Sequence, residues 1–283
     1  LVPRFLRLPV VERCNARGDV LLKLVEDSVR ELISILRDNQ IESVAIVLLH
    51  AYANPDHERR IRDILSAVLP DLWISLSSEV CPEIREYERM STASANAYVQ
   101  PLMASYLTDL DSKLRTEGAV CPLFLMTSGG GLTTVQTARA HPIRLMESGP
   151  AGGAILAGHI ALECGLDKVL SYDMGGTTAK LCLIDRFQPQ KSRHFEIGRA
   201  ERFIKGSGMP VRIPVLEMIE IGAGGGSIAS IDSLGRIQVG PESAGSEPGP
   251  AGFGKGGTLP TISDADISPV SYTHLTLPTI LLV

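Results

Sequence analysis

The sequence predicts an α/β fold, built from helices and short strands that alternate along the chain. The 283 residues are 44% hydrophobic, which is enough to form the core of one large domain or two medium ones. The 27 glycines and 18 prolines, with only 5% aromatic residues, favour a loop-rich α/β protein over a helical bundle. The third observation is the pattern itself, because segments with helical spacing of apolar residues alternate with short apolar runs.

The first predicted elements lie in the N-terminal quarter of the chain. Apolar residues at helical spacing predict a helix over 26–39, which leads into a buried strand over 43–49. Asn54 is a typical helix cap, and Pro55 suits the first position of a helix. The acidic residues that follow favour the positive end of a helix dipole, so a second helix is predicted over 55–68.

The middle of the chain continues the alternation. A short strand is predicted over 73–76, a long helix over 87–116 and another strand over 123–126. Pro101 is expected to kink or divide the long helix. A helix rich in small residues follows over 151–164. The apolar stripe of the long helix is predicted at Ala97, Leu102, Tyr106, Leu110 and Leu114.

The alternation of predicted helices and strands ends after Lys168. The segments 169–174 and 180–185 read as two strands of a hairpin, joined by a Gly-Gly-Thr-Thr turn. Glycine dominates 222–257, where no helix is predicted.

Composition excludes several classes of function. The net charge of −5 provides no basic surface for a nucleic acid. No apolar run reaches the roughly 18–20 residues that a membrane span needs. The five cysteines are scattered without a Cys-x-x-Cys pair, so we interpret them as small buried residues in a reducing, cytoplasmic compartment. His57, beside two acidic residues at a helix start, is interpreted as a surface residue rather than a ligand.

The most informative segment is Asp173-Met174-Gly175-Gly176-Thr177-Thr178. Two glycines allow a tight turn whose amides approach a bound oxyanion, and two threonine hydroxyls can donate to phosphate oxygens. Asp173, at the end of a strand, is placed to hold Mg²⁺ beside those phosphates. The segment is neither a Walker A loop nor a dinucleotide-binding glycine motif. On spacing alone, an Asp-capped hairpin without a ligand is an equal alternative.

A second glycine cluster contains Gly224, Gly225 and Gly226. Three consecutive glycines are costly to order, so a fold usually keeps them where something approaches the backbone closely. A nucleoside is one candidate for the group that approaches this backbone, and another strand is the alternative. Two further glycine turns, at 128–131 and 148–153, make a phosphate-binding cleft more probable than any single loop does.

Eight motifs in order give a specific resemblance. They are Asn54-Pro55-Asp56-His57-Glu58-Arg59-Arg60, Arg85-Glu86-Tyr87-Glu88-Arg89, Ser148-Gly149-Pro150-Ala151-Gly152-Gly153, Asp173-Met174-Gly175-Gly176-Thr177-Thr178, Gly222-Ala223-Gly224-Gly225-Gly226-Ser227, Val239-Gly240-Pro241-Glu242-Ser243-Ala244-Gly245, Pro248-Gly249-Pro250-Ala251 and Pro260-Thr261-Ile262-Ser263-Asp264-Ala265. Together they resemble the hydantoinase A / 5-oxoprolinase family, which also includes a subunit of acetone carboxylase.

The resemblance implies a domain organisation and a fold. Residues 1–91 are expected to be the C-terminal part of the family's N-terminal domain, and 92–267 the first part of its hydantoinase A domain. The expected architecture is the two-lobed fold of actin, sugar kinases and Hsp-type ATPases, present as an internal fragment. The pattern stops after Ile267, so 268–283 is expected to be a non-native tail.

The resemblance also implies a site and its cofactors, ATP and Mg²⁺. Asp173, Gly175, Gly176 and Thr177 match the superfamily's phosphate-holding Asp-x-Gly-Gly-Thr turn, and Gly224–Gly226 resemble its nucleoside-side loop. The family's earlier turn of this type has no match before Asp173, so this polypeptide alone is expected to bind ATP weakly and to be inactive. Relatives commonly carry Asp where Lys180 stands, which removes a carboxylate near the metal and adds a cation.

The family chemistry is ATP-driven opening of a cyclic amide or imide of the hydantoin or 5-oxoproline type, with a hydantoinase B-type subunit as the expected partner. Glu147 and Asp264 are candidates for a general base, and a capping role is the alternative for both. Two other functions stay open. One is an acetone carboxylase-type subunit, and the other is a non-catalytic ATP-binding switch like actin or a chaperone.

Overall fold

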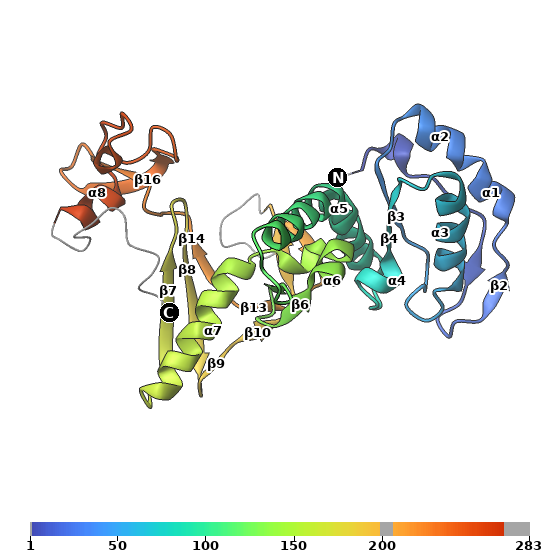
Figure 1. Cartoon of the computed structure of the whole chain (residues 1–283), viewed down its shortest axis with the longest axis horizontal. Coiled ribbons are helices and arrows are strands. Elements are labelled where there is room, and N and C mark those ends of the chain that lie inside the picture. Colours follow the sequence, from blue (N-terminus) through green and yellow to red (C-terminus); the bar gives the residue numbers. More distant parts are fainter. Residues whose placement is uncertain (1, 199–205, 269–283) are drawn as a thin grey trace. The chain divides into compact units, whose positions relative to one another are not determined.

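The computed structural model describes residues 2–198 and 206–268, which form two compact units. Unit 1 comprises Leu1–Gly152 and Lys191–Leu216, and unit 2 comprises Gly153–Gln190 and Glu217–Val283. Helices and strands alternate in unit 1, whereas antiparallel strands dominate unit 2 (Figure 1). The α/β class is therefore confirmed at the level of secondary structure.

The N-terminal part of unit 1 is a β-α-β layer. The parallel strands β3 (Ser43–Ile46) and β4 (Trp73–Leu76) pair in register, and α3 (Asp56–Val68) connects them. α1 (Glu26–Arg30) and α2 (Leu32–Asp38) replace the single helix predicted over 26–39, because regular helix is interrupted at Glu31. Their apolar residues share one core. This core contains Val29, Ile33, Leu36, Ile46, Ile61, Ile64, Leu65 and Leu76.

The start of α3 follows the predicted capping chemistry with a shift of one residue. Pro55 takes the cap position, and the Asn54 carboxamide oxygen accepts the Asp56 amide at 3.0 Å. β3 ends at Ile46, three residues earlier than predicted. Before these elements lie a short 3₁₀ turn, η1 (Arg4–Leu6), and an antiparallel pair, β1 (Arg13–Cys14) with β2 (Val20–Leu22).

The long helix α5 (Glu86–Thr116) is the centre of the second part of unit 1. It follows the short helix α4 (Ser77–Val80) and runs through Pro101 without dividing. The predicted apolar stripe is wrong in part, since Leu102 is 76% exposed and Tyr106 57% exposed. The helix instead buries small and polar residues, which pack closely against their neighbours. These include Ser91, Thr92, Ala93, Ala95, Asn96, Ala97, Gln100 and Ala104.

Short elements surround α5. They are β5 (Phe124–Met126), β6 (Leu132–Thr134), α6 (Val135–Ala140), η2 (Pro142–Leu145), β10 (Lys191–Ser192), β11 (Phe195–Ile197), β12 (Met209–Val211) and β13 (Val215–Leu216). Of these, η2, β11, β12 and β13 share a second core with α4 and α5. Its buried residues are Val80, Ala95, Ile143, Val211, Ile213 and Val215. Residues 191–216 thus return to unit 1 and complete its core.

A buried polar network links α3, α4 and α5. The Glu58 carboxylate accepts hydrogen bonds from the Ser77 hydroxyl at 2.6 Å and from the amides of Leu48 and Ser78. Arg89 is fully buried and donates to Ser77 Oγ and to the carbonyls of Leu48 and Glu83. Buried charges are tolerated only when they are bonded in this way.

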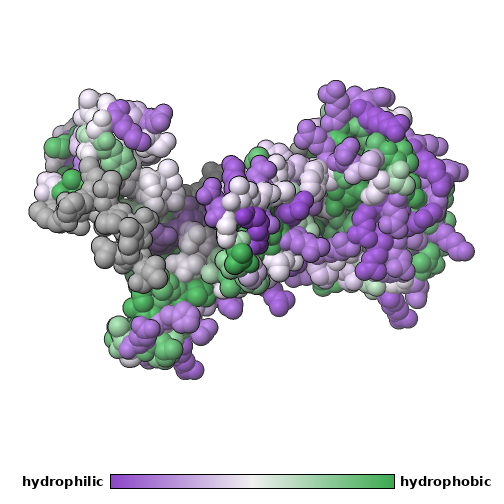
Figure 2. Space-filling model, viewed as in Figure 1, coloured by the Kyte–Doolittle hydropathy of each residue, from purple (hydrophilic) through white to green (hydrophobic). Residues whose placement is uncertain are grey.

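Unit 2 contains a four-stranded antiparallel sheet. β7 (Lys168–Met174) and β8 (Ala179–Asp185) form the predicted hairpin, β14 (Ile219–Ile221) pairs with β8, and β9 (Gln188–Pro189) extends it. α7 (Ser148–Glu163) begins in unit 1 and continues beside this sheet (Figure 1). Hydrophobic side chains gather at the surface over α7 (Figure 2). Leu156, Ile160 and Leu162 are each more than half exposed there.

The rest of unit 2 is glycine-rich. It contains the antiparallel pair β15 (Ser227–Ile231) and β16 (Ile237–Ser243), the 3₁₀ turn η3 (Ala251–Phe253) and α8 (Ile262–Ile267). No α-helix lies within 222–257, as predicted. The proposed non-native tail, apart from Ser268, lies outside the described residues.

Two further expectations concern membranes and cysteines. None of the helices in the described ranges is long and apolar enough to cross a bilayer. All five cysteines are free. Cys14, Cys81 and Cys182 are buried as expected, whereas Cys121 and Cys164 are exposed, so that interpretation was wrong for these two.

Candidate functional site

The predicted phosphate turn joins β7 to β8 in unit 2. Asp173 lies next to the end of β7, and the turn is closed by a hydrogen bond from the Gly175 amide to the Thr178 carbonyl oxygen at 2.9 Å. Gly175, Gly176 and Thr177 are exposed. The turn is therefore open to solvent at these three residues.

The structure brings the second glycine cluster directly onto this turn. The amide of Gly225 donates to the Gly175 carbonyl oxygen at 2.9 Å, and that of Gly226 donates to Gly176 at 2.7 Å. A β-carbon on Gly224 would lie 2.6 Å from the Gly175 oxygen, a distance that side chains do not tolerate. The close approach predicted for this glycine run is thus made to the phosphate turn itself.

This contact leaves a row of amides on the turn. Within residues 2–198 and 206–268, the N–H groups of Gly176, Thr177 and Thr178 donate to no protein acceptor. Successive unpaired amides on a turn form a concavity that favours an anion. The Thr177 and Thr178 side chains lie on the same turn, so the donors that the sequence predicted for phosphate are gathered in one place.

The charges beside the turn alternate in sign. Strand register places Asp173 opposite Lys180, and Lys180 opposite Glu220. Directly paired residues of an antiparallel sheet point to the same face. Lys180 has a side chain only 12% exposed, and its Nζ lies 3.8 Å from a Glu220 oxygen. The two carboxylates therefore flank one ammonium group, and the row carries a net charge of about −1.

Asp264 lies close to the glycine run but has a capping role. Ser263, its neighbour, donates its amide to the Gly225 carbonyl oxygen at 2.8 Å. Asp264 forms a reciprocal capping box with Thr261 and accepts the Gly252 amide at 2.6 Å. Burial raises the pKa of Asp264, but the hydrogen bonds from Gly252, Thr261 and Ala251 outweigh burial and hold the pKa below its usual value. These bonds use both carboxylate oxygens.

Glu147, the other candidate base, lies in unit 1 immediately before α7. Its backbone has a positive φ of 58°, and its carbonyl oxygen accepts the Ala151 amide at 3.2 Å. The left-handed conformation is uncommon for a residue other than glycine and is held by the start of α7. The structure places Glu147 immediately before the start of α7, and both the general-base and the capping interpretation stay predictions.

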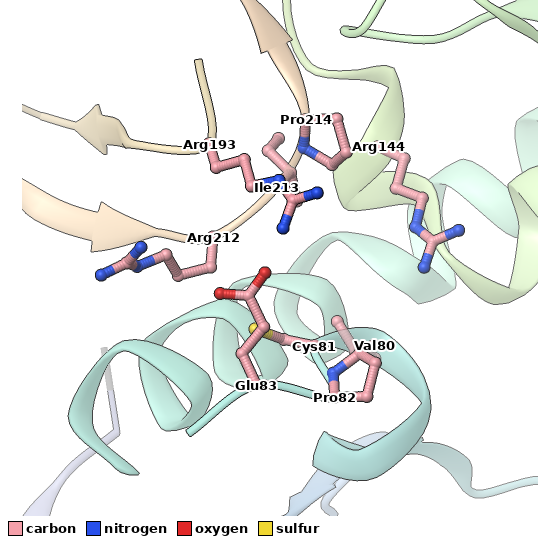
Figure 3. A pocket seen from close by; sticks show the side chains of 9 residues that line it. All are labelled: Val80, Cys81, Pro82, Glu83, Arg144, Arg193, Arg212, Ile213 and Pro214. Atoms are coloured by element: carbon pink, nitrogen blue, oxygen red, sulfur yellow. The ribbon is translucent and has the colours of Figure 1, made fainter. Parts of the chain in front are cut away.

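Unit 1 contains a cavity that the sequence analysis missed. It has a volume of about 240 Å³ and is lined by three arginines, Arg144, Arg193 and Arg212, and by Glu83 (Figure 3). The cavity is lined by three guanidinium groups and the Glu83 carboxylate, and Arg212 is also paired with Glu88, so an excess positive charge of about one remains, which favours an anionic ligand. The arginines come from η2 and from the segment around β11 and β12, so their separation in sequence conceals the cluster.

The walls of this cavity are fixed by buried groups. Arg89 holds the loop that carries Glu83 by donating to the Glu83 carbonyl oxygen at 2.9 Å. Arg212 lies 3.6 Å from a Glu88 oxygen, and its amide donates to Thr92 Oγ1. Burial, and then the Glu83 carboxylate, raise the pKa of the Cys81 thiol in the wall, which keeps this thiol neutral near pH 7. Arg89, from the Arg85–Arg89 motif, therefore supports one wall of this cavity.

The fold and the glycine turn define an α/β protein with a candidate phosphate-binding hairpin. Residues 89–268 match the Hydantoinase/oxoprolinase family, and residues 1–69 match the N-terminal region of that family. The chain belongs to this family, as its motifs predicted.

Relatives and solved structures agree with this assignment. The chain is 36% identical to the caprolactamase alpha subunit of Pseudomonas jessenii, over 95% of this chain and 37% of that protein. It is 34% identical to the 5-oxoprolinase of Saccharomyces cerevisiae, over 88% of this chain and 18% of that protein. The crystal structure of the ATP-dependent caprolactamase aligns with a TM-score of 0.72 and 35% identity, over 94% of this chain and 37% of that chain. The nucleotide-free structure of acetone carboxylase, from work on ATP-dependent acetone carboxylation, aligns with a TM-score of 0.72 and 27% sequence identity. The alignment covers 92% of this chain and 36% of that chain.

The chain therefore spans about two fifths or less of the length of these proteins. Some of the relatives are named as subunits, which indicates multi-subunit enzymes, and two are named as ATP-dependent.

Proposed function

We propose that this chain is the phosphate-holding part of an ATP-dependent enzyme subunit that opens a cyclic amide or imide ring. The observation that carries the proposal is the turn of Gly175–Thr178. The glycine run holds this turn in place, and three of its amides donate to no acceptor among the residues that the structure describes. An Asp-x-Gly-Gly-Thr turn of this kind fits a lobe of the actin and sugar-kinase type. The proposed nucleotide is ATP, in keeping with the ATP-dependent relatives.

ATP is needed because a ring amide is a poor electrophile. Transfer of the γ-phosphoryl group to the carbonyl oxygen makes the ring carbon electrophilic enough for water to add to it. The ring C–N bond then breaks as its nitrogen takes up a proton, and hydrolysis of the resulting acyl phosphate releases the carboxylate and phosphate. Catalysis of such a transfer consists mainly of positioning and charge neutralisation. The amides of Gly176–Thr178 and the two threonine hydroxyls would hold phosphate oxygens, and Gly224–Gly226 would support the turn on the nucleoside side.

The donor set also fits a divalent cation. Asp173 is exposed at the turn and would bind Mg²⁺, either directly or through water, which is the way this ion usually binds beside phosphates. Lys180 would supply positive charge next to Asp173, which reduces the local excess of carboxylate. The proposed substrate is a hydantoin, 5-oxoproline or a related lactam. The proposed partner is a hydantoinase B-type subunit, in the cytoplasm.

The test is phosphate release from ATP by the full-length protein with its partner subunit. Hydantoins, 5-oxoproline, caprolactam, and acetone with bicarbonate are offered in turn. We expect stimulation by one ring substrate and loss of at least 99% of it in Asp173→Ala. Asp185→Ala is the matched control, because Asp185 is an exposed carboxylate at the far end of the same hairpin. Phosphate release that survives Asp173→Ala would contradict the assignment of Asp173 to the phosphate site. Phosphate release that no substrate stimulates would favour an ATP-binding switch.

A carboxylase of the acetone carboxylase type is the second candidate. The arginine-lined cavity favours it, because Arg144, Arg193 and Arg212 are suited to bicarbonate or a carboxylate. Phosphate release that requires both a ketone and bicarbonate would identify this reaction. Phosphate release that depends on a ring substrate and needs no bicarbonate would identify the ring-opening reaction.

A further inference from the structure

A cluster of three potential metal ligands lies in unit 1, separate from the phosphate turn. Cys14 ends the short strand β1, Glu12 immediately precedes that strand, and His57 comes from the first turn of α3. His57 Nδ1 lies 2.8 Å from Glu12 Oε2 and 3.7 Å from Cys14 Sγ, and all three ligand atoms lie within 4.8 Å of one another. Residues more than forty positions apart in sequence thus converge on one point.

The three side chains are withdrawn from solvent. Cys14 is 2% exposed, and the side chains of Glu12 and His57 are 7% and 13% exposed. His57 is therefore not the surface residue that its sequence context indicated. A titratable cluster buried to this extent needs its polar atoms satisfied, because unpaired buried groups are costly.

Both polar contacts within this cluster are made by one atom, His57 Nδ1, which faces Glu12 Oε2 and Cys14 Sγ. A carboxylate without its proton can only accept, so a hydrogen bond from His57 to such a carboxylate at Glu12 requires the hydrogen on Nδ1. The same nitrogen then has no lone pair to offer the thiol hydrogen of Cys14. One ring nitrogen faces two groups and can serve only one of them well, whereas a cation between the three atoms would satisfy all of them.

We propose that Glu12, Cys14 and His57 form a binding site for a divalent transition-metal ion of the zinc type. One thiolate, one imidazole and one carboxylate are ligands that zinc accepts, and sulfur and nitrogen ligands exclude Mg²⁺ and Ca²⁺ as natural occupants. The thiolate and the carboxylate together carry about −2, which balances the ion. Three protein ligands leave a fourth position for water.

The two distances from His57 Nδ1 need little adjustment. Tetrahedral zinc with ordinary bond lengths separates a nitrogen and a sulfur ligand by about 3.6 Å, and a nitrogen and an oxygen ligand by about 3.4 Å. The nitrogen–sulfur distance already fits, and the carboxylate must withdraw by roughly 0.6 Å from its hydrogen-bonded position. The bound ion would clamp the β1 strand to the beginning of α3.

The test is spectroscopic and independent of ATP. The purified chain, freed of metal by a chelator, is titrated with Co²⁺, which substitutes for zinc and reports its ligands. We expect one equivalent to produce visible bands of tetrahedral cobalt and an ultraviolet thiolate-to-cobalt charge-transfer band. Added Zn²⁺ should abolish both signals. Cys14→Ser should remove the charge-transfer band, and His57→Gln should weaken Co²⁺ binding at least tenfold.

The exposed thiols provide the matched control. The double variant Cys121→Ser/Cys164→Ser should keep the full cobalt spectrum, because neither residue belongs to the cluster. X-ray absorption at the zinc edge of the unmodified protein needs no variant, and it should show one sulfur among nitrogen and oxygen ligands. The absence of sulfur from that shell, or a charge-transfer band that survives Cys14→Ser, would overturn the proposal.

Discussion

At the residue scale, Gly224 shows most directly how the sequence determines the candidate phosphate site. Its Cα faces the turn so closely that an added β-carbon would meet the Gly175 oxygen and the Thr177 backbone at 2.6 Å. Both obstacles are main-chain atoms, which cannot rotate away. Gly224→Ala is therefore expected to lower the free energy of unfolding by roughly 1–3 kcal/mol, the usual cost of overpacking. Urea unfolding followed by circular dichroism measures this change.

Gly153→Ala is the control for that substitution. Gly153 lies in α7, and a β-carbon there meets no atom within 4 Å. Alanine is also the better helix former, so this variant should be neutral or stabilised by up to about 1 kcal/mol. Equal losses in the two variants would mean that the contact between the glycine run and the turn is not what selects glycine.

His141 provides a second prediction at this scale. It lies at the end of α6, and its buried Nδ1 has no hydrogen-bond partner in the described part of the chain. Burial, followed by the charge of Arg144, lowers the pKa of His141 from its ordinary value near 6.5. The unfolded chain therefore binds the proton more readily than the folded one, and stability should fall as the pH drops below about 6.5.

Urea midpoints at pH 7.5 and pH 5.5 test this dependence. His141→Gln removes the titrating group, so its midpoint should shift less between the two pH values than that of the unmodified chain. His159→Gln, at an exposed position, should retain the full shift. An unchanged shift in His141→Gln would show that another group controls the acid sensitivity.

At the scale of elements, Arg89 connects the helix α5 to two loops. It is fully buried and donates to Ser77 Oγ, Leu48 O and Glu83 O. A lysine in its place carries one compact ammonium, which cannot reach three acceptors that lie in different directions. Arg89→Lys should therefore cost roughly 2–4 kcal/mol of unfolding free energy. It should also loosen the loop that carries Glu83.

Arg85→Lys is the matched substitution on the same helix end. The Arg85 side chain is 66% exposed and lies 3.7 Å from Glu88, so this change should cost less than about 0.5 kcal/mol. The two variants are compared by chemical denaturation, and the loop by hydrogen exchange of its amides. A stable Arg89→Lys protein with unaltered exchange would contradict the supporting role.

The elements also show what can be predicted from sequence. The hairpin of β7 and β8 was predicted within one residue because strand alternation and a Gly-Gly turn are local signals. The stripe predicted for α5 failed because that helix packs through small and polar residues, and Leu102 remains exposed. Periodicity identifies apolar faces, whereas burial of polar residues depends on tertiary partners that no local pattern contains.

The candidate site, like the fold, could be predicted from sequence only in part. The glycines of the turn and of the run could be recognised because each motif is continuous in sequence. Their mutual contact, through Gly225 and Gly226, could not, because it joins segments about fifty residues apart. Glu12, Cys14 and His57, like the three arginines of the cavity, are single residues in unremarkable contexts. Only the fold brings each group together.

At the scale of the whole molecule, the exposed apolar surface of unit 2 predicts a measurable property of the chain. Leu170 and Leu183 pair across β7 and β8 on one face of the sheet, and each is more than half exposed. A contiguous apolar face of this kind binds hydrophobic dyes. The folded chain should therefore enhance the fluorescence of anilinonaphthalene sulfonate.

The double variant Leu170→Lys/Leu183→Glu tests this expectation. It places opposite charges across the strands, which preserves the pairing, and it should reduce the dye fluorescence at least twofold. Val120→Lys, at an isolated exposed position, should not. Undiminished fluorescence in the double variant, with unchanged circular dichroism, would place the dye-binding surface elsewhere.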